Sequence, residues 1–203
     1  MPQKYISVDI EASGPIPGKY SMISFGACVV GDIGQQFYRE LKPITQNFEK
    51  EAMLVGCLGL RCLEDILHRD GYDPRLKRSF KPELVLDVLL QKGEEPARAM
   101  NEFGLWVTQT TQGYTPVLAA APLSFDGPFI FWYFGNFAPS ANPFGYNVAD
   151  MDSVYRCVIR STKGTMRDLN IPDNRKPPHN ALEDAIYQAQ EFEVVFEMMK
   201  QKK

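Results

Sequence analysis

The first 42 residues of the chain are patterned as β-strands, which restricts the folds that it can adopt. The runs 5–11 and 22–30 are rich in apolar and β-branched residues, and a cluster of glycine and proline separates them. A third run, 36–42, is followed by Pro43, a residue that a central strand cannot accommodate. We therefore expect a meander of three antiparallel strands at the start of a sheet.

Helical spacing replaces this pattern from residue 48 to about residue 107, where apolar residues recur every three or four positions. The segment 69–93 is more charged and carries two prolines, so we interpret it as an excursion with a short helix near 83–90. Its basic side chains fit either a solvated loop or an accessory contact to phosphate groups. They are Arg75, Lys77, Arg78 and Lys81.

A further strand and helix follow. Residues 115–121 form a small, apolar run between Gly113 and Pro122, which is typical of a buried strand. Residues 124–128 have the pattern of a helix start, and the helix expected next, 129–137, is aromatic on nearly every side. We interpret this helix as part of the core; an exposed stacking or dimer surface is the alternative.

The last part of the chain is expected to hold a short strand or turn at 148–150, a helix at 153–161 and a final helix. Asn180 can cap that final helix, and Glu183, three residues later, can reach back to it. This order of strands and helices is typical of an α/β or α+β layered domain. With 44% hydrophobic residues, we expect the whole chain, 1–203, to form a single domain around one substantial core.

Four carboxylates stand where such a fold would bring side chains together. Asp9 and Glu11 lie two residues apart near the end of the first strand, so their side chains share one face, with α-carbons roughly 7 Å apart. Asp126 directly follows the buried strand, where α/β sheets present side chains to a ligand crevice. The paired acids repel and lose hydration when buried, so a divalent cation is their natural partner. Taken singly, the pair also fits an exposed strand edge, and Asp126 a helix cap.

A histidine belongs to the same set. His179 and Asp184 are five residues apart, which on a continuous helix would separate them by about 140°. Pro177 and Pro178 change this, because they place His179 on the entry loop and Asp184 in the first helical turn, where both can face one cleft. Taken alone, His179 fits a surface role, as does His68, which has no acidic motif around it.

Charge and cysteine content exclude several classes of protein. The net charge of −3 and pI near 5.5 argue against a protein that coats nucleic acid by bulk electrostatics, although acids neutralised by bound cations can still face a phosphate. Zinc is not expected, because the cysteines form no CxxC pair, and we expect free thiols. They are Cys28, Cys57, Cys62 and Cys157. The N-terminus lacks an apolar stretch, so we expect a soluble, cytoplasmic protein without membrane contact.

Three segments of the chain resemble, in order and spacing, the motifs of the DEDDh family of 3′-to-5′ exonucleases. They are Asp9-Ile-Glu11-Ala-Ser-Gly14, Ser124-Phe125-Asp126 and His179-Asn-Ala181-Leu-Glu-Asp184. The resemblance spans nearly the whole chain and implies a ribonuclease-H-like fold, in which helices flank a mixed sheet of antiparallel and parallel strands. It departs at Ala121-Pro122, where family members commonly carry His-Asn, and this puts the anchoring and specificity of the substrate in doubt.

The resemblance also implies a role for each residue of the set. Asp9 would bridge two metal ions, Glu11 and Asp184 would complete the site of the ion that binds the attacking water, and Asp126 would help hold the second ion. His179 would be the general base that takes the proton from that water. The expected cofactors are two divalent ions, Mg²⁺ or Mn²⁺, because hard cations prefer oxygen ligands.

The expected substrate is a nucleic acid with a free 3′ end, and the motifs leave DNA and RNA equally open. The small residues Ala12, Ser13 and Gly14 would let the backbone approach a terminal nucleotide. Phe125 fits either beside the sugar or base or in the core. A homodimer is one assembly that we consider.

Two other functions are compatible with these motifs. The first is a catalytically silent domain of the same fold that binds nucleic acid or a partner protein. The second is a proofreading module that acts in trans with a polymerase. A retained cluster of acids favours an active exonuclease over a silent domain, because an idle site gains nothing from such costly residues.

Overall fold

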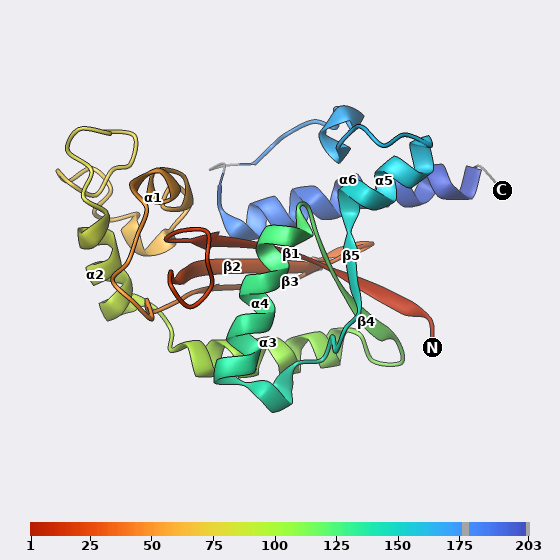
Figure 1. Cartoon of the computed structure of the whole chain (residues 1–203), viewed down its shortest axis with the longest axis horizontal. Helices are drawn as coiled ribbons and strands as arrows, with labels where there is room; N and C mark the ends of the chain where they lie inside the picture. Colours follow the sequence, from red (N-terminus) through yellow and green to blue (C-terminus); the bar gives the residue numbers. More distant parts are fainter. Residues whose placement is uncertain (176–178, 202–203) are drawn as a thin grey trace.

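The computed structural model describes residues 1–175 and 179–201, and a mixed five-stranded sheet forms the centre of this described part (Figure 1). The strand order is β3-β2-β1-β4-β5. Strands β1, β2 and β3 pair in antiparallel fashion, as the sequence predicted, whereas β4 is parallel to both β1 and β5. The strands are β1 Gln3–Ala12, β2 Met22–Val29, β3 Asp32–Glu40, β4 Thr115–Ala120 and β5 Val148–Asp150.

The third strand begins earlier than the sequence predicted. It was expected over 36–42, but β3 starts at Asp32, directly after Gly31, whose φ of +84° suits a tight turn. Residues 34–36 of β3 are exposed, because β3 is the edge strand of the sheet. An exposed edge lacks the alternation of apolar and polar residues by which a strand is recognised in a sequence.

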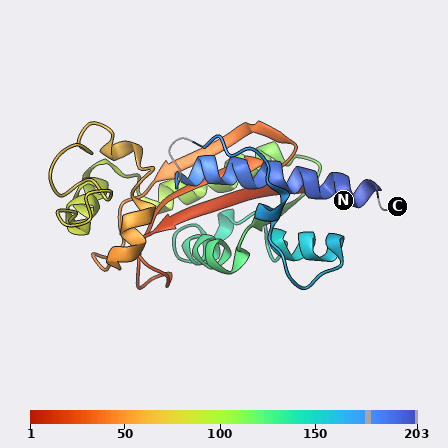
Figure 2. The ribbon, with the colours of Figure 1, turned by 90° about the horizontal axis from the view of Figure 1, so that it is seen from above.

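Helices cover both faces of the sheet. They are α1 Lys50–Gly56, α2 Pro82–Lys92, α3 Pro96–Thr110, α4 Leu123–Phe137, α5 Met151–Ile159 and α6 Ala181–Gln201, with short 3₁₀ helices η1 Arg61–Leu63, η2 Pro139–Ala141 and η3 Met166–Leu169. The helix expected near 83–90 is confirmed as α2, which has a proline in its first turn. Figure 2 shows α6 running lengthwise over the sheet.

Two neighbouring residues of β2 show which helix lies on which face. Phe25 packs against Phe103 of α3, with ring centroids 5.2 Å apart. Gly26 points the other way, and a Cβ added there would come within 2.3 Å of the backbone of Leu182 in α6. Because position 26 has no side chain, the first turn of α6 can lie directly on the sheet.

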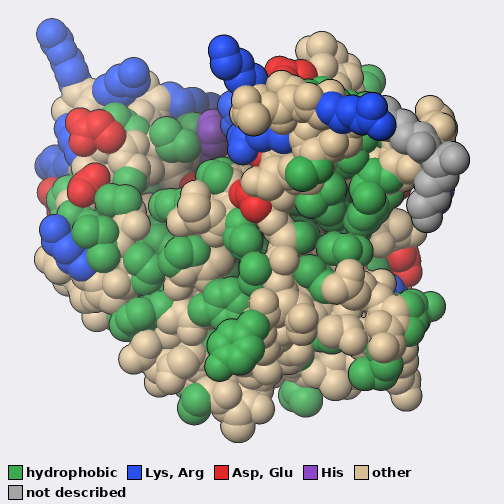
Figure 3. Space-filling view, turned by 45° about the vertical axis from the view of Figure 1, so that its right-hand side comes forward, with side chains coloured by type: hydrophobic (Ala, Val, Ile, Leu, Met, Phe, Trp, Pro, Cys, Tyr) green, Lys and Arg blue, Asp and Glu red, His purple; other side chains and the backbone are tan. Residues whose placement is uncertain are grey.

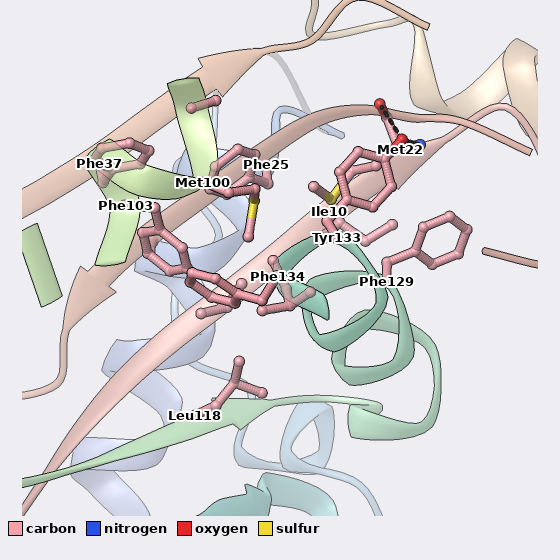
Figure 4. Packing of buried hydrophobic residues seen from close by; sticks show 14 of the residues in the cluster. Ile10, Met22, Phe25, Phe37, Met100, Phe103, Leu118, Phe129, Tyr133 and Phe134 are labelled. Carbon is pink, nitrogen blue, oxygen red and sulfur yellow. Dashed lines mark hydrogen bonds between the residues drawn. The ribbon is translucent and has the colours of Figure 1, made fainter. Parts of the chain in front are cut away.

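The larger core is aromatic and lies between the sheet and the helices α3 and α4 (Figure 4). Phe103 and Phe134 stack with centroids 5.8 Å apart and an interplanar angle of 19°. Tyr133 is fully buried, and its hydroxyl accepts a hydrogen bond of 2.8 Å from the backbone N–H of Met22. Burying such side chains contributes roughly 1.5–3 kcal/mol each. The interpretation of 129–137 as a core helix is therefore confirmed.

The start of α4 differs from the prediction. The helix begins at Leu123, so Pro128 lies inside it, where proline has no N–H to offer the carbonyl of Ser124. Asp126 lies in the first turn, and the cap position belongs to Pro122. The alternative interpretation of Asp126 as a helix cap is therefore wrong. A proline in the sixth helical position is rarer than one at the start, which explains why the sequence pattern was misplaced.

The helices α1 and α2 and the turns between them pack around a second apolar cluster beside the sheet, at the left of Figure 1. The segment 69–81 lies here. Its basic side chains at 75, 77, 78 and 81 are exposed, and Arg75 forms an ion pair of 2.8 Å with Asp73. Both interpretations of these basic residues, loop or phosphate contact, stay open.

The four cysteines are free, as expected; two are buried, and Cys157 is exposed. Across residues 1–175 and 179–201, no helix has both the length and the apolar character needed to span a bilayer.

Candidate active site

The residues that the sequence singled out as metal ligands and base meet in one cleft of about 770 Å³. Asp9 and Glu11 reach it from β1, and Asp126 from the first turn of α4. Asp184 reaches it from the first turn of α6, and His179 from the turn that precedes this helix. A volume in this range is typical of a small-ligand site. The structure thus brings together five side chains that lie up to 175 positions apart in the sequence.

Three of these side chains are especially close. One potential ligand atom from each of Glu11, His179 and Asp184 lies within 4.8 Å of the other two. His179 is exposed and has a φ of +59°, in the left-handed region that non-glycine residues rarely adopt. The expectation that Pro177 and Pro178 set the position of His179 lies outside the described residues.

The start of α6 is fastened from two sides. The side-chain oxygen of Asn180 accepts hydrogen bonds from the N–H groups of Leu182 and Glu183, at 3.1 and 3.2 Å, which confirms Asn180 as the cap. Its amide nitrogen donates to the carbonyl of Gly59 at 2.7 Å. A return bond from Glu183 to Asn180 is not found among the described residues, so the second half of the predicted capping box is wrong.

Asp126 is held against β1 by the backbone. Its Oδ1 accepts a hydrogen bond of 3.0 Å from the N–H of Ile10, the residue between the two acids of the strand. This bond ties the first turn of α4 to β1. The third carboxylate therefore stands beside the first two.

Burial and mutual repulsion raise the pKa of each of the four candidate metal-binding acids. Loss of water is the largest cause of the raised pKa of Asp9, and Asp126, Glu11 and Asp184 add to it. Burial, followed by the charges of Asp184 and Asp126, raises the pKa of Glu11. Burial raises the pKa of Asp126 to about 7. A bound cation would stabilise the ionised form of these buried carboxylates. Because all four offer oxygen ligands, they fit a hard divalent ion.

Arg175 was not anticipated from the sequence. Its guanidinium donates to Asp184 Oδ1 at 2.7 Å and to Asp173 Oδ2 at 2.6 Å, and its Cζ lies 4.3 Å from the ring centroid of Tyr187. It lowers the pKa of Asp184, although burial, the largest cause, leaves that pKa raised. The segment before the final helix shows only an Asp-x-Arg pair in the sequence, which is too common to indicate a site.

Two polar residues of α6 were also missed. Gln188 donates from Nε2 to Asp9 Oδ1 at 2.8 Å, and its Oε1 accepts from the N–H of Ala121 at 3.1 Å. Glu191 is buried and lines the same cleft, and its Oε1 has no hydrogen-bond partner in the described part of the chain. Both follow Asp184 on the buried face of the final helix, whose other residues are apolar, and that run of polar residues is the signal by which they could have been found.

The residues predicted to contact substrate differ in their exposure. Phe125 lines the cleft and is 36% exposed. Ala12, Ser13 and Gly14 are buried. The Ser13 hydroxyl donates to the carbonyl of Asn47 at 2.8 Å, and a Cβ on Gly14 would lie 2.5 Å from the ring of Tyr20. These three side chains are thus engaged within the protein, and their contacts to a nucleotide stay a prediction.

Charged side chains are unevenly spread over the surface of the molecule (Figure 3). Figure 3 shows Lys and Arg side chains gathered along the upper part of the face, with a histidine and acidic groups between them, while the lower part carries almost no charge. His68, for which the sequence indicated a surface role, is exposed.

The sheet order and its helices define the class of protein. The chain superposes on the nuclease domain of 3′hExo, a DEDDh family member bound to rAMP, with a TM-score of 0.65 and 10% identity over 97% of this chain and 92% of that one. It also superposes on Escherichia coli Exonuclease I in complex with a dA16 oligonucleotide, with a TM-score of 0.63 and 14% identity, covering 98% of this chain and 42% of that one. The fold is therefore that of the ribonuclease-H-like exonucleases, as predicted.

A curated relative narrows the class to a family. The chain is 36% identical over 204 aligned residues to the 3′-5′ DNA exonuclease Cap18 of Escherichia coli, with 98% of this chain and 95% of the relative covered. No family model matches the chain. The chain belongs to the DEDDh family of 3′-to-5′ exonucleases, and its activity as a divalent-metal-dependent nuclease follows from that membership.

Proposed function

We propose that this exonuclease removes nucleotides one at a time from the 3′ end of DNA, with Mg²⁺ or Mn²⁺ as cofactor. The observation that carries the proposal is the convergence of Asp9, Glu11, Asp126, Asp184 and His179 on one cleft. The choice of DNA rests on the relative that is 36% identical and is named a DNA exonuclease. RNA is the alternative substrate that the experiment below distinguishes.

In this proposal the four carboxylates hold two divalent ions. When bound, such ions supply positive charge that stabilises the attacking and leaving oxygens of a phosphodiester. The ligand oxygens come from Asp9, Glu11, Asp126 and Asp184, whose raised pKa values reflect a need for compensating charge.

His179 is proposed as the general base. It would take one proton from the attacking water, whose oxygen forms the new bond to phosphorus while the bond to the 3′ oxygen breaks. That 3′ oxygen takes up a proton from solvent and becomes the terminal hydroxyl of the shortened strand, and the terminal nucleotide leaves as a 5′-monophosphate. Support comes from the exposure of His179 to the cleft and from its closeness to Glu11 and Asp184.

The test is digestion of matched, 5′-labelled single-stranded DNA and RNA oligonucleotides in Mg²⁺, Mn²⁺ or EDTA. We expect a ladder of shortened DNA products with either metal and none in EDTA. Asp9→Ala should abolish the ladder while circular dichroism and Tm in EDTA show an intact fold. Full-length label with both metals would favour the silent domain, and faster digestion of RNA would overturn the choice of DNA.

We further propose that residues 1–203 act as one exonuclease domain, with the segment 69–93 as an accessory surface. The homodimer considered from the sequence stays a prediction. Light scattering coupled to size-exclusion chromatography measures the assembly directly.

A further inference from the structure

Gln188 joins three parts of the active site. It lies in α6 one turn after Asp184 and is 8% exposed. Its Nε2 donates to Asp9 Oδ1 at 2.8 Å, and its Oε1 accepts from the N–H of Ala121 at 3.1 Å, at the end of β4. The side chain of Gln188 therefore links α6, the end of β4 and Asp9 of β1.

The orientation of this amide is set by chemistry. A backbone N–H can only donate, so the group that faces Ala121 must be the oxygen of Gln188. The opposite orientation would place that oxygen against the carboxylate of Asp9 and an NH₂ group against a second donor. The NH₂ group is therefore directed at Asp9 in the arrangement that satisfies both contacts.

Asp9 needs such a partner more than its neighbours do. Three other carboxylates act on it, and the torsion that turns a carboxylate about its Cβ–Cγ bond is soft. A neutral donor on Oδ1 restrains that rotation without placing a positive charge beside Asp9. This differs from Asp184, which contacts the guanidinium of Arg175.

We propose that Gln188 is a positioning residue that holds Asp9 by Oδ1 and so keeps its carboxylate in the orientation needed to bind the divalent ions. The inference rests on the proposed function of Asp9 as a metal ligand. Burial of an amide is costly unless both of its ends are bonded. Here both bonds are made to groups that line the cleft, Asp9 and Ala121.

The experiment replaces Gln188 by side chains of similar size that cannot form hydrogen bonds. In Gln188→Met and Gln188→Leu we expect the half-saturating Mn²⁺ concentration to rise and kcat to fall, each by ~10–100-fold, as is typical when the partner of a metal ligand is lost. KM for the oligonucleotide should change by less than about threefold. The matched control is Gln190→Met, which replaces an exposed glutamine two residues further along the same helix and should leave these quantities unchanged.

Direct calorimetry of Mn²⁺ binding provides a readout that does not require turnover. In an Asp9→Ala background, Gln188→Met should cause no further loss of Mn²⁺ affinity, because the two residues act through one bond. Unchanged Mn²⁺ affinity and kcat in both single variants would overturn the proposal, as would a lower Tm without any change in Mn²⁺ affinity. If the wild-type chain binds Mn²⁺ but digests no oligonucleotide, the proposed function is refuted. The role of Gln188 in Mn²⁺ binding can then still be tested by calorimetry.

Discussion

Arg175 and Asp184 form an ion pair inside the cleft, with 2.7 Å between Nη1 and Oδ1 and side-chain exposures of 26% and 8%. Asp173 and the ring of Tyr187 hold the guanidinium from the other side. One acid of the site is thus compensated by the protein itself. A metal ion that binds Asp184 must share that carboxylate with Arg175 or displace the guanidinium of Arg175 from it.

Replacing Arg175 by alanine should therefore strengthen metal binding. We expect the Mn²⁺ dissociation constant measured by calorimetry without substrate to fall by ~5-fold, about 1 kcal/mol, the upper end for a partly exposed ion pair. The rise in Tm on adding Mn²⁺ should be larger than in wild type, because the metal then supplies all of the compensating charge. Arg98→Ala, which removes an exposed arginine of α3, is the control. Equal Mn²⁺ affinity in wild type and variant would show that Arg175 does not compete.

Replacing His179 by alanine separates its two candidate roles. If His179 is a general base, its loss should lower kcat by ~10²-fold or more while Mn²⁺ affinity stays within about twofold. As a ligand, which its closeness to Glu11 and Asp184 would also permit, its loss should weaken Mn²⁺ binding to a similar degree. His68→Ala, at an exposed position, provides the control. Turnover at the wild-type rate would remove His179 from the mechanism.

Glu191 should make the metal-free protein less stable as pH rises. Burial raises its pKa to about 7 from an ordinary value near 4.5, so between these two pH values the folded chain holds more protons than the unfolded chain. Stability therefore falls across this window, and the full cost is present above pH 7. Glu191→Gln should raise Tm in EDTA at pH 8 but not at pH 4.5. Each kcal/mol gained in the free energy of unfolding should raise Tm by roughly 2–4 °C.

The comparison of Glu191→Gln with wild type at each pH removes the contribution of the other cleft acids, which titrate in both proteins. Asp87→Asn, at an exposed position of α2, should leave the pH profile unchanged. A Tm difference of the same size at both pH values would contradict the assignment.

Gly56 is expected to be essential for the position of Glu11. A Cβ added at residue 56 would lie 2.9 Å from Glu11 Oε2, so Gly56→Ala should push that carboxylate from its place. We expect kcat to fall by ~10-fold or more, with Tm changed by only a few degrees. Gly135→Ala in α4 is the matched control, because a Cβ there meets nothing within 4 Å and should stabilise the helix by about 0.5–1 kcal/mol. Full activity in Gly56→Ala would show that Glu11 can adjust.

The parts of this molecule that the sequence predicted are those encoded by neighbouring residues. The alternation in the first strand, and the placing of Asp126 after a buried strand, both depend on short segments. Arg175 and Gln188 could not be assigned in this way, because their partners Asp184 and Asp9 are identified only when the chain is folded. The start of β3 was missed for a related reason, since an exposed edge strand has few buried residues to mark it.

The glycine at position 26 determines how accurately the site is built. Because α6 and β2 meet there through their main chains, their separation depends on no rotamer and leaves no side chain to compress or rearrange. The distance between the main chain that carries Asp184 and the sheet that carries Asp9 and Glu11 is then set by direct van der Waals contact, which a close-packed interior lets vary little. Main-chain contact between α6 and β2 thereby adds to the hydrogen bonds that fix the dimensions of a site assembled from opposite ends of the chain.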